Sequence, residues 1–573
     1  METADSTLPT PSSKQVTEYR ILPADEAASG MLASACGLGA TAAQVLLHRG
    51  IRDVDEAKAF LSATLRGLSS PAPMADRALA AERLCRAIRN GERIVVFGDY
   101  DVDGTTSALI LTEIIQALGG EAQTLIADRF RGGYGLSDPA LDRCLAHSPT
   151  LIVTCDCGSN DHERISRANS HGIDVIVVDH HLVPEEALPA LAFLNPHRPE
   201  CGFAYKGLCS AGLAFSLGAA LRTELKAELD IRAWLDLVAI GTIADLAPLT
   251  GDNRRLVRAG LKALGSSRVR PAFHALRQVT KLPESAQLTS RDVAFRFAPR
   301  LNAPGRLGEA DLTLRFLQAK TAGEAWRLAE EVERKNDERK SLARQATEEA
   351  HAQAREVYGE APTAGIVVAS DAWHRGVVGI VAARLVDTFG VPAVVVAFDG
   401  DHGHGSARTI GSFDAYSALE RCAEDLTAWG GHRAAAGLSL SKGRLEPFRA
   451  SFSEVSFEPG ASSEMTTRID VELGGAYRVP TLDDLVRLGP FGQDNPAPRF
   501  LLHAGVVEAT AVGQDRSHAK LRLRIGEDSV RAFAPGMFSR VEGRENVRLV
   551  GEFQPDHWVG GHAVEFLVTD VLP

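Results

Sequence analysis

Three aspartates stand at alternate positions directly after a short apolar run. In VVFGDYDVDGTTSALIL (95–111) they are Asp99, Asp101 and Asp103, and Gly104 follows them. Carboxylates this close repel one another unless a cation lies among them. The spacing therefore predicts a metal site, and it leaves open which metal is bound and which reaction it serves.

Further acids and two histidines follow other apolar runs. Asp156 lies in TCDCG after LIVT, and Asp179 begins DHH after VIVV. Two adjacent histidines, His180 and His181, favour contact with a metal or a phosphate over a structural role for both rings. Asp245 in GTIADLAPL adds another acid. This set fits a hydrolase in which two divalent ions about 3.5–4 Å apart clamp a phosphate and lower the pKa of water.

Two other interpretations of the first motif are weaker. An EF-hand calcium loop that started at Asp99 would need a glutamate at its twelfth position, where Ile110 stands, and it would follow a helix instead of a strand. The motif also resembles the start of haloacid-dehalogenase-type phosphatases, in which the first aspartate is a nucleophile. That hypothesis predicts a later lysine and a paired acidic motif, and it gives no role to DHH.

The surrounding pattern predicts an α/β fold with a parallel sheet. Short β-branched runs alternate with helical stretches, which is typical of parallel strands joined by crossover helices. Because parallel strands end at the same edge of a sheet, the acids that follow them should converge there. The predicted strands are 94–97, 151–154 and 175–178, and the predicted helices are 75–92, 105–118 and 161–171.

The second half of the chain predicts a helical connection and two further domains. Residues 321–358 read as one or two charged helices. A second α/β unit follows, with strands near 364–369 and 393–398 and a helix at 376–389 between them. From about residue 460, short alternating strands such as HAKLRLRI and NVRLVGEF indicate a small β-barrel.

Composition limits the class of protein. The length of 573 residues suggests about three to five domains, and no apolar run reaches the roughly 18 residues of a membrane span. The net charge of −12 argues against non-specific coating of DNA, although residues 291–306 and 515–550 are locally basic. Eight cysteines do not suggest a disulfide framework, so Cys155 and Cys157 are predicted to be reduced packing residues. We expect a cytoplasmic protein.

The motif set resembles the DHH phosphoesterase superfamily, and within it the bacterial exonucleases specific for single strands. The resemblance covers about residues 30–573. The usual second motif has Asn where Cys157 stands, and HWVGG (557–561) matches the barrel only loosely. The motifs are, in order, LLHRGI…AKAFL (46–61), GDYDVDG, TCDCG, VVDHH, IADLAPL, APRLNAPGRLG (298–308), WHRGVVGIVAARL (373–385), GSARTIGSFD (405–414), GGHRAAAG (430–437) and LGPFGQDNPAPRF (488–500).

The resemblance implies a ligand set for two divalent cations, Mn²⁺ or Mg²⁺. Asp156 would bridge the two ions, with Asp99 and Asp101 at one site. Asp103, His180 and Asp245 would complete the other site. Asp179 would fix the tautomer of His180 without touching metal, and His181 would contact the scissile phosphate. The implied catalytic residues are Asp101, Asp103, Asp156, Asp179, His180, His181 and Asp245.

The resemblance also implies contacts to a DNA strand lying between the two α/β domains, in a passage too narrow for duplex. Arginine suits phosphate because its planar fork binds two oxygens. The barrel would extend the strand's track by stacking and charge. The residues implied for the 5′ end are Arg129, Ser406 and Arg408, and those implied for the rest of the strand are Arg300, Asn302, Arg306, Gly431 and His432.

The resemblance predicts a single-strand-specific 5′→3′ exonuclease that releases 5′-mononucleotides in DNA repair and recombination. It implies a single-strand-binding protein and a RecQ-type helicase as partners, and a monomer. The predicted organisation is a flexible tail (1–25), an N-terminal region with the DHH catalytic domain (26–320), a connecting helix (321–360), a DHH-associated domain (361–457) and an OB-fold-like barrel (458–573).

Two other functions compete with this prediction. One is a superfamily enzyme that acts on short oligonucleotides or cyclic dinucleotides, but such proteins are generally shorter and lack the barrel. The other is a nucleic-acid scaffold that has lost its acids, whereas every metal position is filled here. Divalent-dependent hydrolysis would separate an enzyme from a scaffold.

Overall fold

A computed structural model describes residues 18–284, 286–455, 466–556 and 563–573. The chain divides into two compact units, and each has its own hydrophobic cores. The first unit comprises residues 22–333 and 469–573, and the second comprises residues 334–468 with the N-terminal strand at 18–21.

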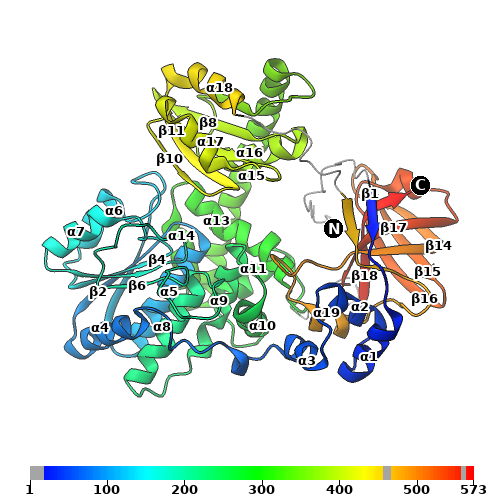
Figure 1. Ribbon diagram of the computed structural model, residues 1–573, viewed down its shortest axis with the longest axis horizontal. Helices are drawn as coiled ribbons and strands as arrows, with labels where there is room; N and C mark the ends of the chain where they lie inside the picture. Colours follow the sequence, from blue (N-terminus) through cyan, green and yellow to red (C-terminus); the bar gives the residue numbers. More distant parts are fainter. Residues whose placement is uncertain (1–17, 285, 456–465, 557–562) are drawn as a thin grey trace. The chain divides into compact units, whose positions relative to one another are not determined.

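The first unit contains a five-stranded parallel sheet (Figure 1). The three predicted strands form its centre, and a strand is added at each edge. The strand order is β3-β2-β4-β5-β6, and all neighbours are parallel. The strands are β2 (Arg93–Gly98), β3 (Glu121–Ile126), β4 (Leu151–Cys155), β5 (Asp174–Val178) and β6 (Ala192–Leu194).

Helices cover both faces of this sheet. Side chains alternate along a strand, so Ile94 and Val96 enter one core, while Val95 and Phe97 enter the opposite one. The predicted helices at 75–92, 105–118 and 161–171 are confirmed. The helices of the first core include α4 (Arg77–Asn90), α5 (Val102–Ala117), α8 (Ser210–Glu224) and α9 (Leu235–Ala244), and those of the second are α6 (Asp138–Leu145) and α7 (His162–Ser170).

A further helical layer packs with the sheet; its first element precedes β2 in sequence and the others follow β6. Its apolar residues join the larger core of the sheet. The elements are η1 (Leu65–Gly67), η2 (Ile231–Trp234), α10 (Gly251–Leu264), α11 (Pro271–Val279), α12 (Ser290–Asp292), η3 (Val293–Phe297), α13 (Ala298–Arg306) and α14 (Ala310–Leu317). The stretch predicted as one or two helices at 321–358 is one helix, α15 (Ala322–Tyr358), which runs from the first unit into the second.

The C-terminal strands close into the predicted barrel. Strand β14 pairs with both β15 and β17, so the order β14-β15-β16-β18-β17 returns to its start. Alternation of buried and exposed residues along HAKLRLRI matches a half-buried strand. The elements are β13 (Val471–Glu472), α19 (Leu482–Leu488), β14 (Phe500–Val512), β15 (His518–Ile525), β16 (Asp528–Ala534), α20 (Phe538–Val541), β17 (Asn546–Pro555) and β18 (Val564–Leu572). HWVGG lies outside the described residues.

The N-terminal helices share a core with the barrel. Leu46 and Leu61 lie in the same buried cluster as Phe500 and Leu549. The sequence had grouped 26–320 with the catalytic domain, and the apolar faces of these helices instead complete the barrel core. They are α1 (Glu26–Cys36), α2 (Ala40–His48) and α3 (Val54–Ser62).

The second unit has a five-stranded mixed sheet in the order β10-β11-β9-β8-β7. The predicted strands near 364–369 and 393–398 and the helix at 376–389 are confirmed. Strand β1 (Glu18–Ile21), within the segment predicted as a tail, pairs with β12 (Thr466–Ile469). The remaining elements are β7 (Ile366–Ser370), α16 (Val378–Phe389), β8 (Ala393–Asp399), β9 (His402–Arg408), α17 (Ala415–Arg421), η4 (Ala423–Asp425), β10 (Ala428–Gly431), β11 (Ala435–Ser441), η5 (Lys442–Arg444) and α18 (Leu445–Glu454).

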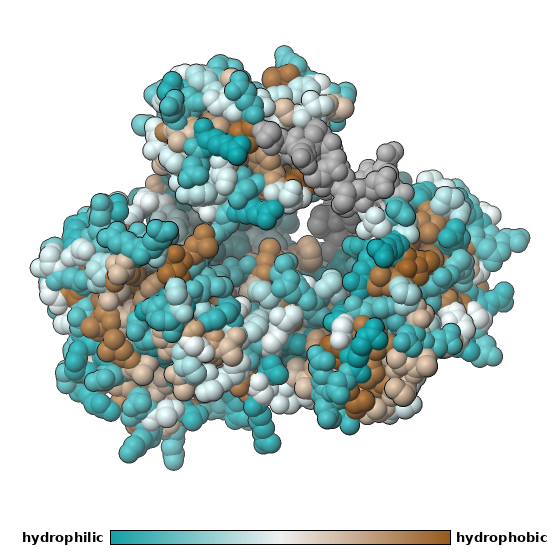
Figure 2. All heavy atoms as spheres, in the orientation of Figure 1, coloured by the Kyte–Doolittle hydropathy of each residue, from teal (hydrophilic) through white to brown (hydrophobic). Residues whose placement is uncertain are grey.

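Among the described helices, none is by itself long and apolar enough to cross a membrane. Helices α1 and α2 reach that length and composition only as a pair, and they are bent by 112° at their junction. On the face shown in Figure 2, hydrophilic residues cover most of the surface and hydrophobic residues occur in small groups.

Candidate metal centre

The aspartate triplet lies where β2 meets α5. Asp101 caps the helix, and its side chain accepts from Gly104 N at 3.0 Å. Two glycines let the strand end and the helix start approach closely. A Cβ at Gly98 would lie 2.3 Å from Gly104 O, and a Cβ at Gly104 would lie 2.5 Å from the backbone of Asp99. The glycines of GDYDVDG therefore hold the three carboxylates in place.

The predicted convergence of acids at one sheet edge is confirmed. Because β4 lies between β2 and β5, the residues that follow these strands are neighbours. Asp156 has a positive φ of 65°, a conformation that aspartate tolerates better than most residues. Ligand atoms of Asp99, Asp101 and Asp156 all lie within 4.8 Å of one another.

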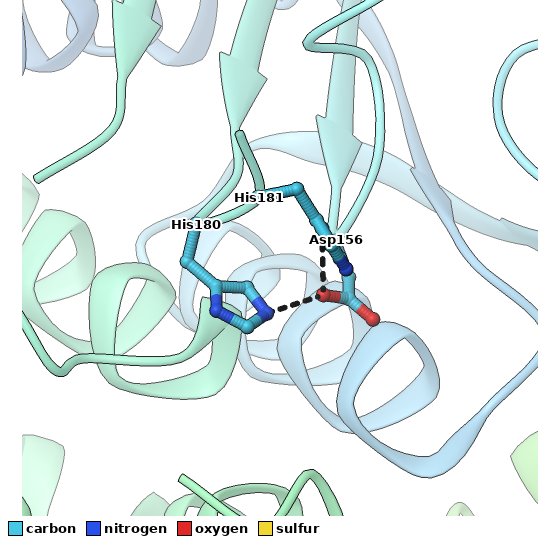
Figure 3. A group of neighbouring side chains, drawn as sticks. All are labelled: Asp156, His180 and His181. Atoms are coloured by element: carbon cyan, nitrogen blue, oxygen red, sulfur yellow. Dashed lines mark hydrogen bonds and ion pairs between the residues drawn. The ribbon is translucent and has the colours of Figure 1, made fainter. Parts of the chain in front are cut away.

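His180 faces three acids. Its Nε2 lies 3.2 Å from Asp156 Oδ1, 3.8 Å from Asp245 Oδ2 and 3.9 Å from Asp103 Oδ2. In Figure 3 the rings of His180 and His181 lie against one carboxylate oxygen of Asp156. The three carboxylates and the imidazole thus form one set of possible metal ligands, which come from four separate elements.

Asp103 is held by the start of α8. Its Oδ2 accepts from Ser210 N at 2.8 Å, and its Oδ1 accepts from Ala211 N at 3.0 Å. Asp245 follows directly on the last residue of α9. The ligand atoms of Asp103, Asp245 and the buried thiol of Cys209 lie within 4.8 Å of one another. The ligand atoms of Asp156, His180 and His181 form a third such group, so Asp156 belongs to two of the three groups. The division of these residues between two metal sites stays a prediction.

The carboxylates repel one another in the absence of a cation. Burial and the charge of Asp101 raise the pKa of Asp103 to about 6. Burial and the charges of Asp103 and Asp101 raise the pKa of Asp245 to about 9. The pKa values of Asp99 and Asp156 are also raised well above the ordinary value, first by burial and then by Asp101. The site carries an electrostatic cost that divalent cations would remove.

An unsatisfied oxygen also fits a metal ligand. Asp99 is buried, and its Oδ1 has no hydrogen-bond partner among the described residues. A buried polar atom of this kind calls for an explanation. A cation bound by Asp99, Asp101 and Asp156 would supply one, since carboxylates suit Mn²⁺ or Mg²⁺.

Asp179 contacts the imidazole of His181, and this differs from the sequence prediction. Its Oδ1 lies 2.7 Å from His181 Nδ1, whereas it meets His180 through the backbone N–H at 2.8 Å. Burial raises the pKa of Asp179, but hydrogen bonds from His181 and Ser159 outweigh it and hold that pKa well below the ordinary value.

Burial lowers the pKa of His181, but its hydrogen bond to the Asp179 carboxylate and the charge of that carboxylate outweigh burial and raise that pKa.

Tyr134, Ser159 and Ser210 also contact this centre and were not predicted from the sequence. The Tyr134 hydroxyl donates to Asp156 O at 3.1 Å and lies 3.1 Å from His181 Nδ1. Ser159 Oγ donates to Asp179 at 2.6 Å, and Ser210 Oγ donates to Asp156 at 3.2 Å. Tyr134 stands in the RFRGGYG stretch that contains Arg129, so proximity in sequence was the available signal.

Arg129 lies beside the loop that carries the aspartate triplet, and its predicted contact with the 5′ end of DNA stays a prediction. Its guanidinium stacks on Tyr100, 5.0 Å from the ring centroid, and its charge lowers the pKa of Asp99. Helix α13 also approaches this loop, since a Cβ at Gly305 would lie 2.4 Å from Tyr100 O. Burial raises the pKa of Tyr100 to about 12, and the charge of Arg306 acts against that rise. Arg306 and the half-buried Asn302 both lie on α13.

Arg300 is paired with an acid of the protein, and its predicted contact with DNA stays a prediction. Its guanidinium forms a two-point ion pair with Glu333 on α15 and also donates to Arg296 O at 2.8 Å. Only 14% of the side chain is exposed. A DNA phosphate could bind Arg300 only if it replaced the ion pair with Glu333 on α15.

The second unit gathers the remaining predicted contacts around β9. Arg408 donates to Ser406 Oγ at 2.7 Å, and both side chains lie against Gly379 at the start of α16. Across the sheet Ser406 pairs with Gly437, which pairs with Gly430, so the three share one face. A Cβ at Gly430 would meet nothing within 4 Å. Gly430 and Gly437 therefore form a patch of backbone without side chains beside Arg408, which we call the glycine floor. Gly431 and His432 follow Gly430 in the chain.

Three family matches cover most of the chain. The DHH family, N-terminal domain, matches residues 93–242, the DHHA1 domain matches residues 363–456 and the RecJ OB domain matches residues 469–570. These ranges coincide with the parallel sheet, the second unit and the barrel.

Curated relatives and solved structures agree with these matches. The chain is 33% identical to the single-stranded-DNA-specific exonuclease RecJ of Bacillus subtilis, covering 92% of this chain and 67% of the relative. It is 35% identical to RecJ of Dickeya dadantii, covering 82% and 84%. The crystal structure of RecJ in complex with Mn²⁺ from Thermus thermophilus superposes with a TM-score of 0.78 at 30% identity, covering 97% of this chain and 79% of that one. The chain therefore belongs to the RecJ family of single-stranded-DNA-specific exonucleases, within the DHH superfamily.

Proposed function

We propose that this protein is a metal-dependent exonuclease that degrades single-stranded DNA from the 5′ end and releases 5′-mononucleotides in DNA repair and recombination. The observation that carries the proposal is the joining of the carboxylates after β2 and β4 with the histidines after β5 at one sheet edge. Relatives named as exonucleases of this specificity match nearly the whole chain.

The donor set suits two divalent cations, Mn²⁺ or Mg²⁺. Asp99, Asp101 and Asp156 would hold one ion, and Asp103, His180 and Asp245 would hold the other, with Asp156 shared. Bound there, the ions would neutralise charge on the scissile phosphate and lower the pKa of water.

The protein's own residues orient the phosphate. Asp179 binds His181 Nδ1, so the ring is fixed with Nε2 as its second polar atom. We assign His181 a direct contact to a phosphate oxygen, and Asp179 and Tyr134 hold its ring in place. An imidazolium that carries a raised pKa beside a carboxylate would favour a negatively charged partner.

We assign DNA phosphate contacts to Arg129, Asn302 and Arg306 in the first unit and, taken by itself, to Ser406, Arg408, Gly431 and His432 in the second. The glycine floor beside Arg408 lets a sugar–phosphate backbone approach without side chains in its way. Arg300 is the weakest of the predicted contacts because Glu333 already occupies it.

The test is a digestion assay with a 3′-labelled single-stranded oligonucleotide and the same strand in a blunt duplex, in Mn²⁺. The expected result is progressive shortening from the 5′ end on the single strand alone. Asp101→Ala is the matched control and should be inactive. Shortening from the 3′ end, or equal digestion of the duplex, would contradict the proposal.

We also propose that the protein acts as a monomer in the cytoplasm beside a single-strand-binding protein and a RecQ-type helicase. Degradation needs an exposed strand, which a helicase supplies and a single-strand-binding protein covers. Light scattering of the purified protein should return the 61.3 kDa mass of one chain. A mass twice as large would contradict the monomer.

A further inference from the structure

Ser210 touches two carboxylates of the metal centre at once. Its hydroxyl donates to Asp156 Oδ1 at 3.2 Å, and its backbone N–H donates to Asp103 Oδ2 at 2.8 Å. The residue is fully buried at the start of α8. These contacts join an acid that follows β4 to an acid on α5, and the two stand in separate ligand groups of the centre.

The Ser210 hydroxyl does not cap its helix. The N-cap of α8 is Cys209, which makes no side-chain cap hydrogen bond, and Ser210 is the first helical residue. The only other contact found for the Ser210 hydroxyl among the described residues is a long one of 3.5 Å to Val178 O. A buried serine whose hydroxyl points at a metal-ligand carboxylate therefore has a different role from the usual helix start.

The contact leaves room for metal. Each carboxylate oxygen can accept at more than one position. The hydrogen bond from Ser210 occupies one acceptor position of Asp156 Oδ1 and restrains the carboxylate, and it uses none of the acceptor positions of Oδ2. The same residue's N–H, with Ala211 N, fixes both oxygens of Asp103. Hydrogen bonds of this kind set the orientation of a ligand before metal arrives.

We propose that Ser210 is a positioning residue that fixes Asp156 and Asp103 relative to each other and so sets the affinity of the centre for divalent cations. The inference rests on the proposed metal centre. It requires no contact between Ser210 and substrate, and it predicts a larger effect on metal binding than on binding of DNA.

The test is a calorimetric titration of the full-length, metal-free protein with Mn²⁺. Ser210→Ala should weaken Mn²⁺ binding about 10- to 100-fold. Ser107→Ala is the matched control, because Ser107 is an equally buried hydroxyl whose bonds go to the backbone carbonyls of Asp103 and Gly104. The control should bind Mn²⁺ within about twofold of wild type.

A second variant separates the hydroxyl from its surroundings. Ser210→Gly also removes the hydroxyl but leaves different space, so a shared loss of Mn²⁺ affinity assigns the effect to the hydrogen bond. Affinity for single-stranded DNA in Ca²⁺ should stay within about threefold, and at limiting Mn²⁺ the lost activity should return when Mn²⁺ is raised. Unchanged Mn²⁺ affinity in both variants would overturn the inference. If wild type itself binds no Mn²⁺, it is the metal centre that fails.

Discussion

At the scale of single residues, the buried aspartates of the metal centre lower the stability of the metal-free fold. Burial and like charges raise the pKa values of Asp99, Asp103, Asp156 and Asp245. Functional sites of this kind reduce the free energy of unfolding because their residues serve activity and not stability. Asp179 is the exception, because hydrogen bonds from His181 and Ser159 keep its charge stable.

Asp156→Asn should therefore stabilise the metal-free protein while it abolishes activity. The amide has the shape of the carboxylate and tolerates the positive φ of 65° at this position, but it removes a buried like charge. We expect a higher midpoint of thermal unfolding without metal, no further rise on addition of Mn²⁺, and a loss of exonuclease rate of about 100- to 1000-fold. Scanning calorimetry with and without Mn²⁺ measures the first two. A lower midpoint without metal would contradict this account of the electrostatics.

The stabilisation that Mn²⁺ gives should grow as pH rises from about 5 to about 8. The pKa of Asp103 is raised to about 6 in the folded chain, above its unfolded value of about 3.9. The metal-free fold therefore loses stability as pH rises from about 4 to about 6, because over that interval the folded chain holds a proton that the unfolded chain has released. A cation needs the carboxylate ionised. The shift of the unfolding midpoint on adding Mn²⁺, measured at each pH, checks this, and a shift that shrinks toward pH 8 would contradict it.

At the scale of elements, the position of the site depends on close approach between helices and loops. Gly305 brings α13 against the loop that carries Tyr100, and Gly98 and Gly104 bring α5 against the end of β2. The sequence showed these glycines inside motifs. It could not show which backbone each one approaches, because those partners are distant in the chain.

Gly305→Ala should push α13 away from the metal loop. Its Cβ would lie 2.4 Å from Tyr100 O, a backbone atom that cannot turn aside. We expect a destabilisation of about 1–3 kcal/mol and a weaker affinity for single-stranded DNA, measured by denaturant unfolding and by fluorescence anisotropy in Ca²⁺. The control is Gly323→Ala on α15, where a Cβ meets nothing within 4 Å. It should be neutral or stabilising by up to about 1 kcal/mol. Equal effects of the two changes would rule out close approach as the cause.

At the scale of the first unit, buried arginines join the helix layer of the parallel sheet to the barrel. Arg254 on α10 stacks on Phe60, 3.7 Å from the ring centroid, and donates to the carbonyl oxygens of Phe60, Arg487 and Leu488. Burial and neighbouring arginines lower the pKa of Arg254 to about 9. These carbonyls stand at the ends of α3 and α19, so one side chain satisfies two helix C-termini.

Arg254→Ala should loosen the barrel from the rest of the first unit. Three carbonyl oxygens lose the hydrogen bond from Arg254, although Leu488 O keeps one from Asn495 Nδ2, and a stacked contact is lost, so we expect a cost of about 2–4 kcal/mol. Hydrogen exchange should rise in α3 and α19 more than in the parallel sheet. Arg86→Ala, at an exposed position of α4, is the control and should change stability by less than about 0.5 kcal/mol. Protection lost evenly across the unit would contradict a local joint.

The sequence by itself determined the chemistry and the order of the domains. Period-2 and period-3.6 patterns located the strands and helices, and parallel strands must end at one edge, so Asp99, Asp156 and Asp179 had to converge. Only the tertiary structure decided which side chains contact one another. It turned His181, and not the ring of His180, toward Asp179. It paired Arg300 with Glu333 and placed α1 to α3 in the barrel core. It also brought Ser210 into contact with the carboxylates of Asp103 and Asp156. Local patterns fix elements because they depend on neighbours in the chain, whereas side-chain partners depend on packing between residues that are far apart in it.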